Sequence, residues 1–131
     1  MDERRVRLVA AGLGFSTALF GAASLVAPRR FARLFGISVP DPSAISMLYS
    51  IGTRDVALGM GLWAAARHGD AYVPWLLARL LVDGGDAAGI GVAVACGWRT
   101  PRFLALGGLA LGAAVCDAAL WTAARRAAPH T

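Results

Sequence analysis

Lysine is absent from this sequence, histidine and cysteine occur only twice each, and charged residues make up 16% of the chain. Hydrophobic residues account for 57% of the 131 residues, which argues against a soluble domain with one core. Arginine without lysine, beside frequent alanine and glycine, is typical of a GC-rich bacterial genome. We therefore predict a bacterial integral membrane protein with a single domain, residues 1–131.

The two cysteines, Cys96 and Cys116, form neither a CxxC pair nor a zinc-binding pattern. The sequence therefore predicts no thiol chemistry, no metal site and no cofactor, and it argues against a quinone-coupled thiol oxidoreductase. Asp83 and Asp86 form half of an aspartate-rich motif with which membrane prenyl transferases bind Mg²⁺, but the further acidic residues and helices of those enzymes are missing. A small four-helix drug exporter would carry an acidic residue in its first span, and none is present here.

Four apolar segments are long enough to cross a bilayer as helices: about residues 6–27, 44–66, 71–96 and 103–124. No clear cleavage site accompanies the first segment, so we interpret it as a retained span and not as a removed signal peptide. The fold class that follows is all-α, an integral membrane four-helix bundle.

Local signals refine this bundle. Gly14 and Gly21 in the first span, and Gly108 and Gly112 in the fourth, are spaced to let a neighbouring helix approach closely. Residues 29–36 alternate arginine with bulky apolar side chains, which predicts a short interfacial helix between spans one and two. Ser43 is the expected N-cap of the second span.

The arginines near the helix ends predict how the chain lies in the membrane. Six of them fall on the side of the two termini and five on the opposite side. The positive-inside rule then places both termini in the cytoplasm of a multi-pass protein of the bacterial inner membrane. We expect the net charge of +5 to contact lipid headgroups and not nucleic acid.

Three charged residues occupy the middle of the third span. Arg79, Asp83 and Asp86 are spaced i, i+4, i+7 and share one face of a helix. Each charge at the membrane centre costs about 2.5–3.5 kcal/mol on insertion scales, whereas a leucine or valine returns only about 0.3–0.6 kcal/mol. This face must therefore turn toward partners in the same protein.

Depth in the membrane predicts those partners, because each helical residue rises about 1.5 Å. Depth is counted from the helix ends on the side opposite the two termini. By this count, Arg54 and Asp55 of the second span lie level with Asp86, all at roughly 15–17 Å. Asp83, at about 20 Å, joins a second group with Arg79 and with Asp117 of the fourth span, both at about 24–26 Å.

Two arginines then face four aspartates, and arginine is always charged. Desolvation favours the neutral form of an unpaired carboxyl. We expect the two surplus carboxyls to be protonated, to hydrogen-bond to Tyr49, Ser50 or Thr53, or to hold a cation. A neutral carboxylic acid beside a paired carboxylate provides an acid and a base for catalysis.

The segment GTRDVALGMG, residues 52–61, with the acidic residues of the third span and the four-span length, resembles the DoxX-like group of small bacterial four-helix membrane proteins. The resemblance implies a compact four-helix membrane bundle. Some members of that group are linked to quinone or sulfur redox systems, but this chain has no cysteine pair for such chemistry.

We favour a membrane-embedded enzyme that performs cofactor-free acid–base catalysis, an isomerisation, cyclisation or epoxide opening, on a lipophilic substrate. Asp86 or Asp83 is expected to donate a proton and Asp55 or Asp117 to accept one, while Arg54 and Arg79 stabilise negative charge. The expected substrate space lies between spans two, three and four, where Gly84, Gly85 and Gly89 leave room, and the remaining predicted binding residues are Tyr49, Thr53 and Trp75.

Two other functions stay open. In the first, the chain is a non-catalytic membrane partner or assembly subunit whose buried ion pairs only fix the packing of the helices. In the second, it is a small proton-coupled transporter in which the surplus carboxyls bind and release protons. The expected partners are the lipid bilayer and a lipophilic small molecule, and a homodimer is possible.

Overall fold

The computed structural model describes residues 2–39, 41–69 and 71–127. Within these ranges the chain forms five α-helices and no strand, which confirms the all-α prediction. The helices are α1 (Glu3–Val26), α2 (Pro28–Leu34), α3 (Pro42–His68), α4 (Val73–Ala95) and α5 (Pro101–Ala127). Each of the four long helices covers one of the expected apolar segments, and α2 is the short helix expected between the first two.

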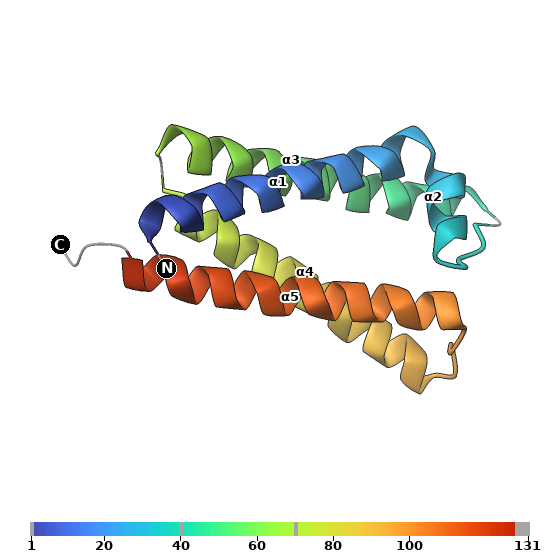
Figure 1. Ribbon diagram of the computed structural model, residues 1–131. Coiled ribbons are helices and arrows are strands. Elements are labelled where there is room, and N and C mark those ends of the chain that lie inside the picture. Colours follow the sequence, from blue (N-terminus) through green and yellow to red (C-terminus); the bar gives the residue numbers. More distant parts are fainter. Residues whose placement is uncertain (1, 40, 70, 128–131) are drawn as a thin grey trace.

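The four long helices form two antiparallel pairs (Figure 1). Helix α1 packs along α3, and α4 packs along α5, whereas contacts between the two pairs are sparse. The pairs meet at the end of the molecule where α1 begins and α5 ends, and they diverge toward α2 (Figure 1). The beginning of the first long helix and the end of the last therefore lie on the same side, as an even number of antiparallel helices requires.

The hydrophobic core lies at the end where the pairs meet. Its largest members come from all four long helices and include Val6, Leu62, Leu76 and Leu120. Toward the other end the packing thins out: no residue of α4 after Arg79 is buried, and no residue of α5 before Ala114 is buried. The outer halves of α4 and α5 thus contact little beyond each other.

Glycines hold α1 and α3 close together. A Cβ atom on Gly14 would lie 2.6 Å from the backbone nitrogen of Trp63, and a Cβ on Gly21 would lie 2.6 Å from the carbonyl oxygen of Gly52. Gly59 of α3 in turn faces the backbone of Ala18. Only glycine allows two helix backbones to approach so closely, so the expected close packing at Gly14 and Gly21 is confirmed.

The same expectation for the fourth span is wrong. No heavy atom lies within 4 Å of a Cβ built on Gly108 or Gly112, so these two glycines face away from the other helices. The glycine that meets α4 is Gly107, whose Cβ would lie 2.9 Å from the Cγ2 atom of Ile90. Adjacent residues point about 100° apart on a helix, so the spacing of a glycine pair alone does not fix which face is packed.

The start of α3 also differs from the prediction. The N-cap is Asp41 and not Ser43, because the Asp41 carboxylate accepts a hydrogen bond from the backbone N–H of Ala44. The Ser43 hydroxyl donates to the same carboxylate, and together these bonds lower the pKa of Asp41. At the other end of α3, Gly69 adopts the left-handed conformation, and the Arg7 guanidinium donates to the carbonyl oxygen of Ala66.

By length and composition, α1 and α5 are apolar enough to cross a bilayer. Helices α3 and α4 are long enough, but each carries charged residues in its middle. The chain is therefore a helical protein with two candidate membrane spans among the described residues.

Candidate functional site: two arginine-centred carboxylate clusters

Two clusters of charged side chains lie between the helices. The first is centred on Arg54 of α3. Its Nη1 and Nη2 atoms donate to both oxygens of Asp86 on α4, at 3.2 and 2.8 Å. Its Nε atom donates to Oδ1 of the neighbouring Asp55, at 3.1 Å. This Arg54 cluster therefore links the two helix pairs, with a bidentate contact to Asp86 and a contact to one oxygen of Asp55.

The second cluster is centred on Arg79 of α4. Its Nη2 atom contacts Oδ2 of Asp83 one turn along the same helix, at 2.9 Å, and its Nε atom contacts Oδ1 of Asp117 on α5, at 3.3 Å. Its Nη1 atom donates to the hydroxyl of Thr17 on α1. The Arg79 cluster thus ties α1, α4 and α5 together.

These are the two groups that residue counting predicts, and the pairing of each arginine with its two aspartates is confirmed. Thr17 is the member that sequence reasoning missed. Its helix carries no charge in its middle, and its depth differs from that of Arg79, so counting along the helices does not place the two together. The one available signal was a hydroxyl in a mostly apolar span, and Ser16 and Ser24 of that span share it.

The clusters differ in their access to the surroundings. The side chains of Arg54 and Asp86 are 32% and 41% exposed, whereas those of Arg79 and Asp117 are 4% and 0% exposed. Asp86 lies beyond Arg79, the last buried residue of α4, whereas Arg79 and Asp117 are themselves buried. A molecule from outside can therefore reach the first cluster and not the second.

The Arg79 cluster has more carboxyl groups than arginines, and one of its carboxyl oxygens has no hydrogen-bond donor in the described part of the chain. One arginine faces two carboxyls there, and the Oδ2 atom of Asp117 is buried without a hydrogen-bond partner among the described residues. A buried acceptor without a donor is unfavourable unless it carries a proton that it can donate. The count of two arginines and four aspartates predicts two surplus carboxyls, and that Asp117 is one of them stays a prediction.

The three residues predicted to bind substrate do not join either cluster. Tyr49 and Thr53 are exposed on α3, and in the described part of the chain neither side chain hydrogen-bonds to a cluster residue. The ring of Trp75, near the start of α4, packs directly over Gly61. Tyr49 and Thr53 lie on the exposed side of α3, and Trp75 lies one turn before Arg79 on α4, where its ring packs against α3.

Helix α4 is open at the three glycines expected to leave room, and the substrate space between spans two, three and four stays a prediction. No heavy atom lies within 4 Å of a Cβ built on Gly84, Gly85 or Gly89. These glycines lie within three residues of Asp86 along α4, so the helix is open at these three positions, while Arg54 of α3 contacts the Asp86 carboxylate itself. Among the described residues, no three His, Cys, Asp or Glu side chains gather as metal ligands would.

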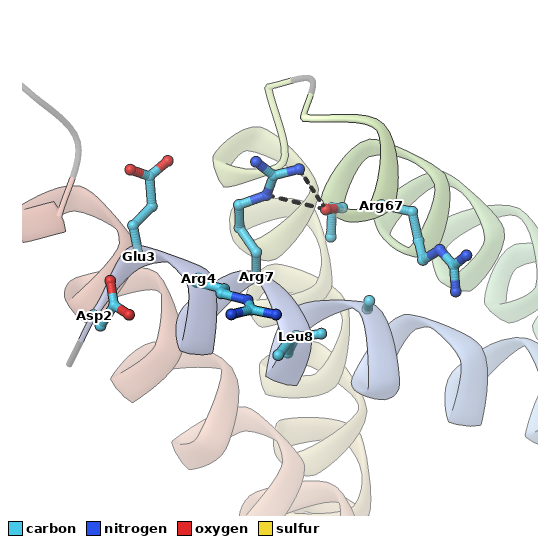
Figure 2. A pocket seen from close by; sticks show the side chains of 8 residues that line it. Asp2, Glu3, Arg4, Arg7, Leu8 and Arg67 are labelled. Atoms are coloured by element: carbon cyan, nitrogen blue, oxygen red, sulfur yellow. Dashed lines mark hydrogen bonds between the residues drawn. The ribbon is translucent and has the colours of Figure 1, made fainter.

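Two surface hollows lie away from the clusters. One, of about 490 Å³, is formed by the start of α1 and the end of α3, and Figure 2 shows the Arg7 guanidinium in it with its two hydrogen bonds to the Ala66 carbonyl. Its lining mixes both signs of charge, since Asp2 and Glu3 accompany the arginines. The other hollow lies at the opposite end, between α2 and α5.

Fold and site together define a small helical protein with apolar outer surfaces and two internal arginine–carboxylate clusters. A family model described as "Domain of unknown function (DUF4267)" matches residues 14–125, which include all the cluster residues, and the chain belongs to this family. No curated protein and no solved structure matches the chain significantly.

Proposed function

We propose that this protein is a membrane-embedded enzyme that uses the Arg54 cluster for acid–base catalysis on a lipophilic substrate. The observation that carries the proposal is the placement of charge. A bidentate Arg54–Asp86 pair and the adjacent Asp55 lie in the middle of helices whose outer surfaces are apolar, and the pair joins α3 to α4. The resemblance to the DoxX-like group agrees with this membrane placement and stays a prediction.

The distribution of polarity supports a four-helix membrane bundle formed by α1, α3, α4 and α5. Buried side chains include the charged residues Asp55, Arg79 and Asp117. Large apolar side chains on all four helices are exposed, among them Leu19, Met60, Leu81 and Leu111. This arrangement is the reverse of a soluble protein and is expected where hydrocarbon surrounds the helices.

All four tryptophans lie near helix ends, where a membrane interface would be. Trp63 and Trp121 lie in the last two turns of α3 and α5, and each ring carries an arginine of the next turn over its face. Trp75 lies at the start of α4, and Trp98 follows its end. Tryptophan at the headgroup level with arginines extending outward is typical of membrane helices.

The two native cysteines test this placement. Both are exposed, but Cys96 lies at the end of α4 and Cys116 in the middle of α5. In native membranes, made permeable so that the reagent reaches both faces, a water-soluble maleimide is expected to label the Cys116→Ser variant, which retains Cys96. The Cys96→Ser variant, which retains Cys116, should be labelled only after denaturation. Labelling of both variants at similar rates in intact bilayers would contradict a membrane-spanning α5.

The geometry favours particular roles within the Arg54 cluster. Both oxygens of Asp86 accept hydrogen bonds from one guanidinium, so neither is occupied by a proton in this arrangement and the carboxylate is the group that can take one up. Asp55 contacts Arg54 through one oxygen only, which leaves its other oxygen to carry a proton. We therefore assign Asp86 as the base and Asp55 as the acid, which is the reverse of the order expected from sequence.

Such a pair moves protons without any redox partner. The Asp86 carboxylate takes a proton from the substrate, and Asp55 gives a proton to a double bond or an epoxide oxygen of the substrate. The negative charge thereby moves from Asp86 to Asp55, and Arg54, which contacts both, stabilises it in either place. A later proton transfer from Asp86 to Asp55 restores the starting state. Isomerisation, cyclisation and epoxide opening each need this acid and base and no cofactor.

The Arg79 cluster has a different role in this proposal. It is buried, it joins three helices, and no open surface adjoins Asp117. These contacts support a structural role, as expected for an assembly subunit, so we assign this cluster to holding the bundle together. Catalysis is assigned to the Arg54 cluster alone.

The test is to delete the gene in its native host, restore it as wild type or as Asp86→Asn, and compare the lipophilic metabolites. We expect the variant to accumulate in the membrane like the wild type, while the precursor builds up as in the deletion strain. The amide keeps the size of the side chain but no longer accepts a proton. Asp41→Asn is the matched control, because Asn also caps a helix and Asp41 lies outside both clusters. Identical metabolite profiles in all strains would refute the catalytic role.

A further inference from the structure

The end of the molecule farthest from the core carries a hollow lined by arginines. Arg30, Arg33 and Leu34 of α2 line one side, and Arg102 of α5 lines the other, around a volume of about 540 Å³. The hollow therefore lies where the two diverging helix pairs are bridged by α2 and the turn that follows it.

Packing holds these arginines in place from both sides. Phe31 of α2 and Phe35, the residue after α2, pack against Phe20 of α1 in edge-on and tilted orientations, with ring centroids 4.8 and 6.2 Å from that of Phe20, which fixes α2 against α1. Gly36 adopts a φ of 72°, and a Cβ on it would lie 3.3 Å from the Cβ of Arg102. The turn after α2 thus packs against the first turn of α5, so that both sides of the hollow are held together.

The hollow has positive charge with no counter-charge. Among the described residues, none of its three arginines forms an ion pair, and Arg33 bonds only to the backbone carbonyl of Arg29. The carboxylate nearest in sequence is Asp41, which is engaged in capping α3. The hollow at the opposite end differs in this respect, because acidic side chains accompany its arginines.

We propose that this hollow binds the phosphate group of an anionic phospholipid. Guanidinium groups match phosphate oxygens in geometry and charge, and three arginines line this hollow together with Leu34, which is 70% exposed and available to an acyl chain. The site lies at the end of the helices. Because helices of this length span the hydrocarbon core of a bilayer, their ends lie at the level of the lipid headgroups. The inference rests on the membrane placement proposed above and not on the acid–base chemistry.

The experiment is native mass spectrometry of the whole protein in neutral detergent with added phosphatidylglycerol. We expect wild type to retain one lipid tightly, and Arg102→Gln to bind it about tenfold more weakly, because a charge-assisted hydrogen bond is lost. The Arg30→Gln/Arg33→Gln double variant removes the other side of the hollow and should lose the lipid in the same way. Arg99→Gln is the matched control, since Arg99 lies at the same end and does not line the hollow.

Several results would overturn the site. Equal weakening by Arg99→Gln would indicate diffuse attraction to a basic surface. Equal retention of phosphatidylcholine would show that anionic lipid is not selected, and full displacement by an equal concentration of inorganic phosphate would indicate a free-phosphate site. Asp86→Asn is expected to bind the lipid like wild type, so failure of the lipid site and failure of the catalytic proposal are separate outcomes.

Discussion

Replacing Arg79 with methionine is expected to lower the free energy of unfolding by about 3–5 kcal/mol, the range found when one partner of a buried ion pair is removed. Methionine fills similar space but leaves Asp83 and Asp117 facing each other without a cation, and it removes the bond to Thr17 on α1. Thermal or denaturant unfolding in detergent micelles measures the change.

Arg54→Met is the matched comparison for this experiment. The same change there is expected to cost less, because Arg54 and Asp86 are partly exposed and their charges can be solvated when the pair is broken. A second variant, Arg79→Met combined with Asp117→Leu, should recover part of the lost stability, since it removes the buried charge together with its partner. Equal stability of Arg79→Met and wild type would contradict a structural role of the Arg79 cluster.

Substituting alanine for Gly59 is expected to separate α1 from α3, at a cost near or above the upper end of the range of about 1–3 kcal/mol for overpacking. The added Cβ would lie 2.5 Å from the carbonyl oxygen of Gly14 and still closer to the backbone of Ala18. Backbone atoms cannot rotate aside as a side chain can, so the helices must move apart. The loss is measured by unfolding in micelles.

Gly108→Ala provides the control, because no heavy atom lies within 4 Å of the added methyl group. There alanine is expected to leave stability unchanged or to raise it by up to about 1 kcal/mol through its better helix propensity. A loss as large as that of Gly59→Ala would show that Gly108 is packed, and comparable stability of both variants would contradict the close approach of α1 and α3.

Most of the helices and the composition of both charged clusters were predictable from the sequence. Apolar length and proline positions set the helices to within a few residues, and a constant rise per residue fixed how far along its helix each charge lies. Charge balance then required Arg54 and Arg79 to meet the aspartates at similar depth. These are properties of single helices, so no knowledge of their neighbours was needed.

Rotation about each helix axis could not be obtained in this way. It depends on which faces pack, and it decided that Gly107 and not Gly108 meets α4, and that Tyr49 and Thr53 lie on the exposed side of α3. It also brought Thr17 to Arg79, although their depths differ.

The sequence by itself therefore determined which segments are helical, how far along its helix each charge lies and how many buried-segment aspartates exceed the arginines. The tertiary structure alone decided that α1 pairs with α3 and α4 with α5, that the pairs diverge, and that the Arg54 cluster is open while the Arg79 cluster is closed. The physical reason is that helix formation and axial position follow from local hydrogen bonds, whereas the choice of neighbours follows from close packing of small residues across the chain.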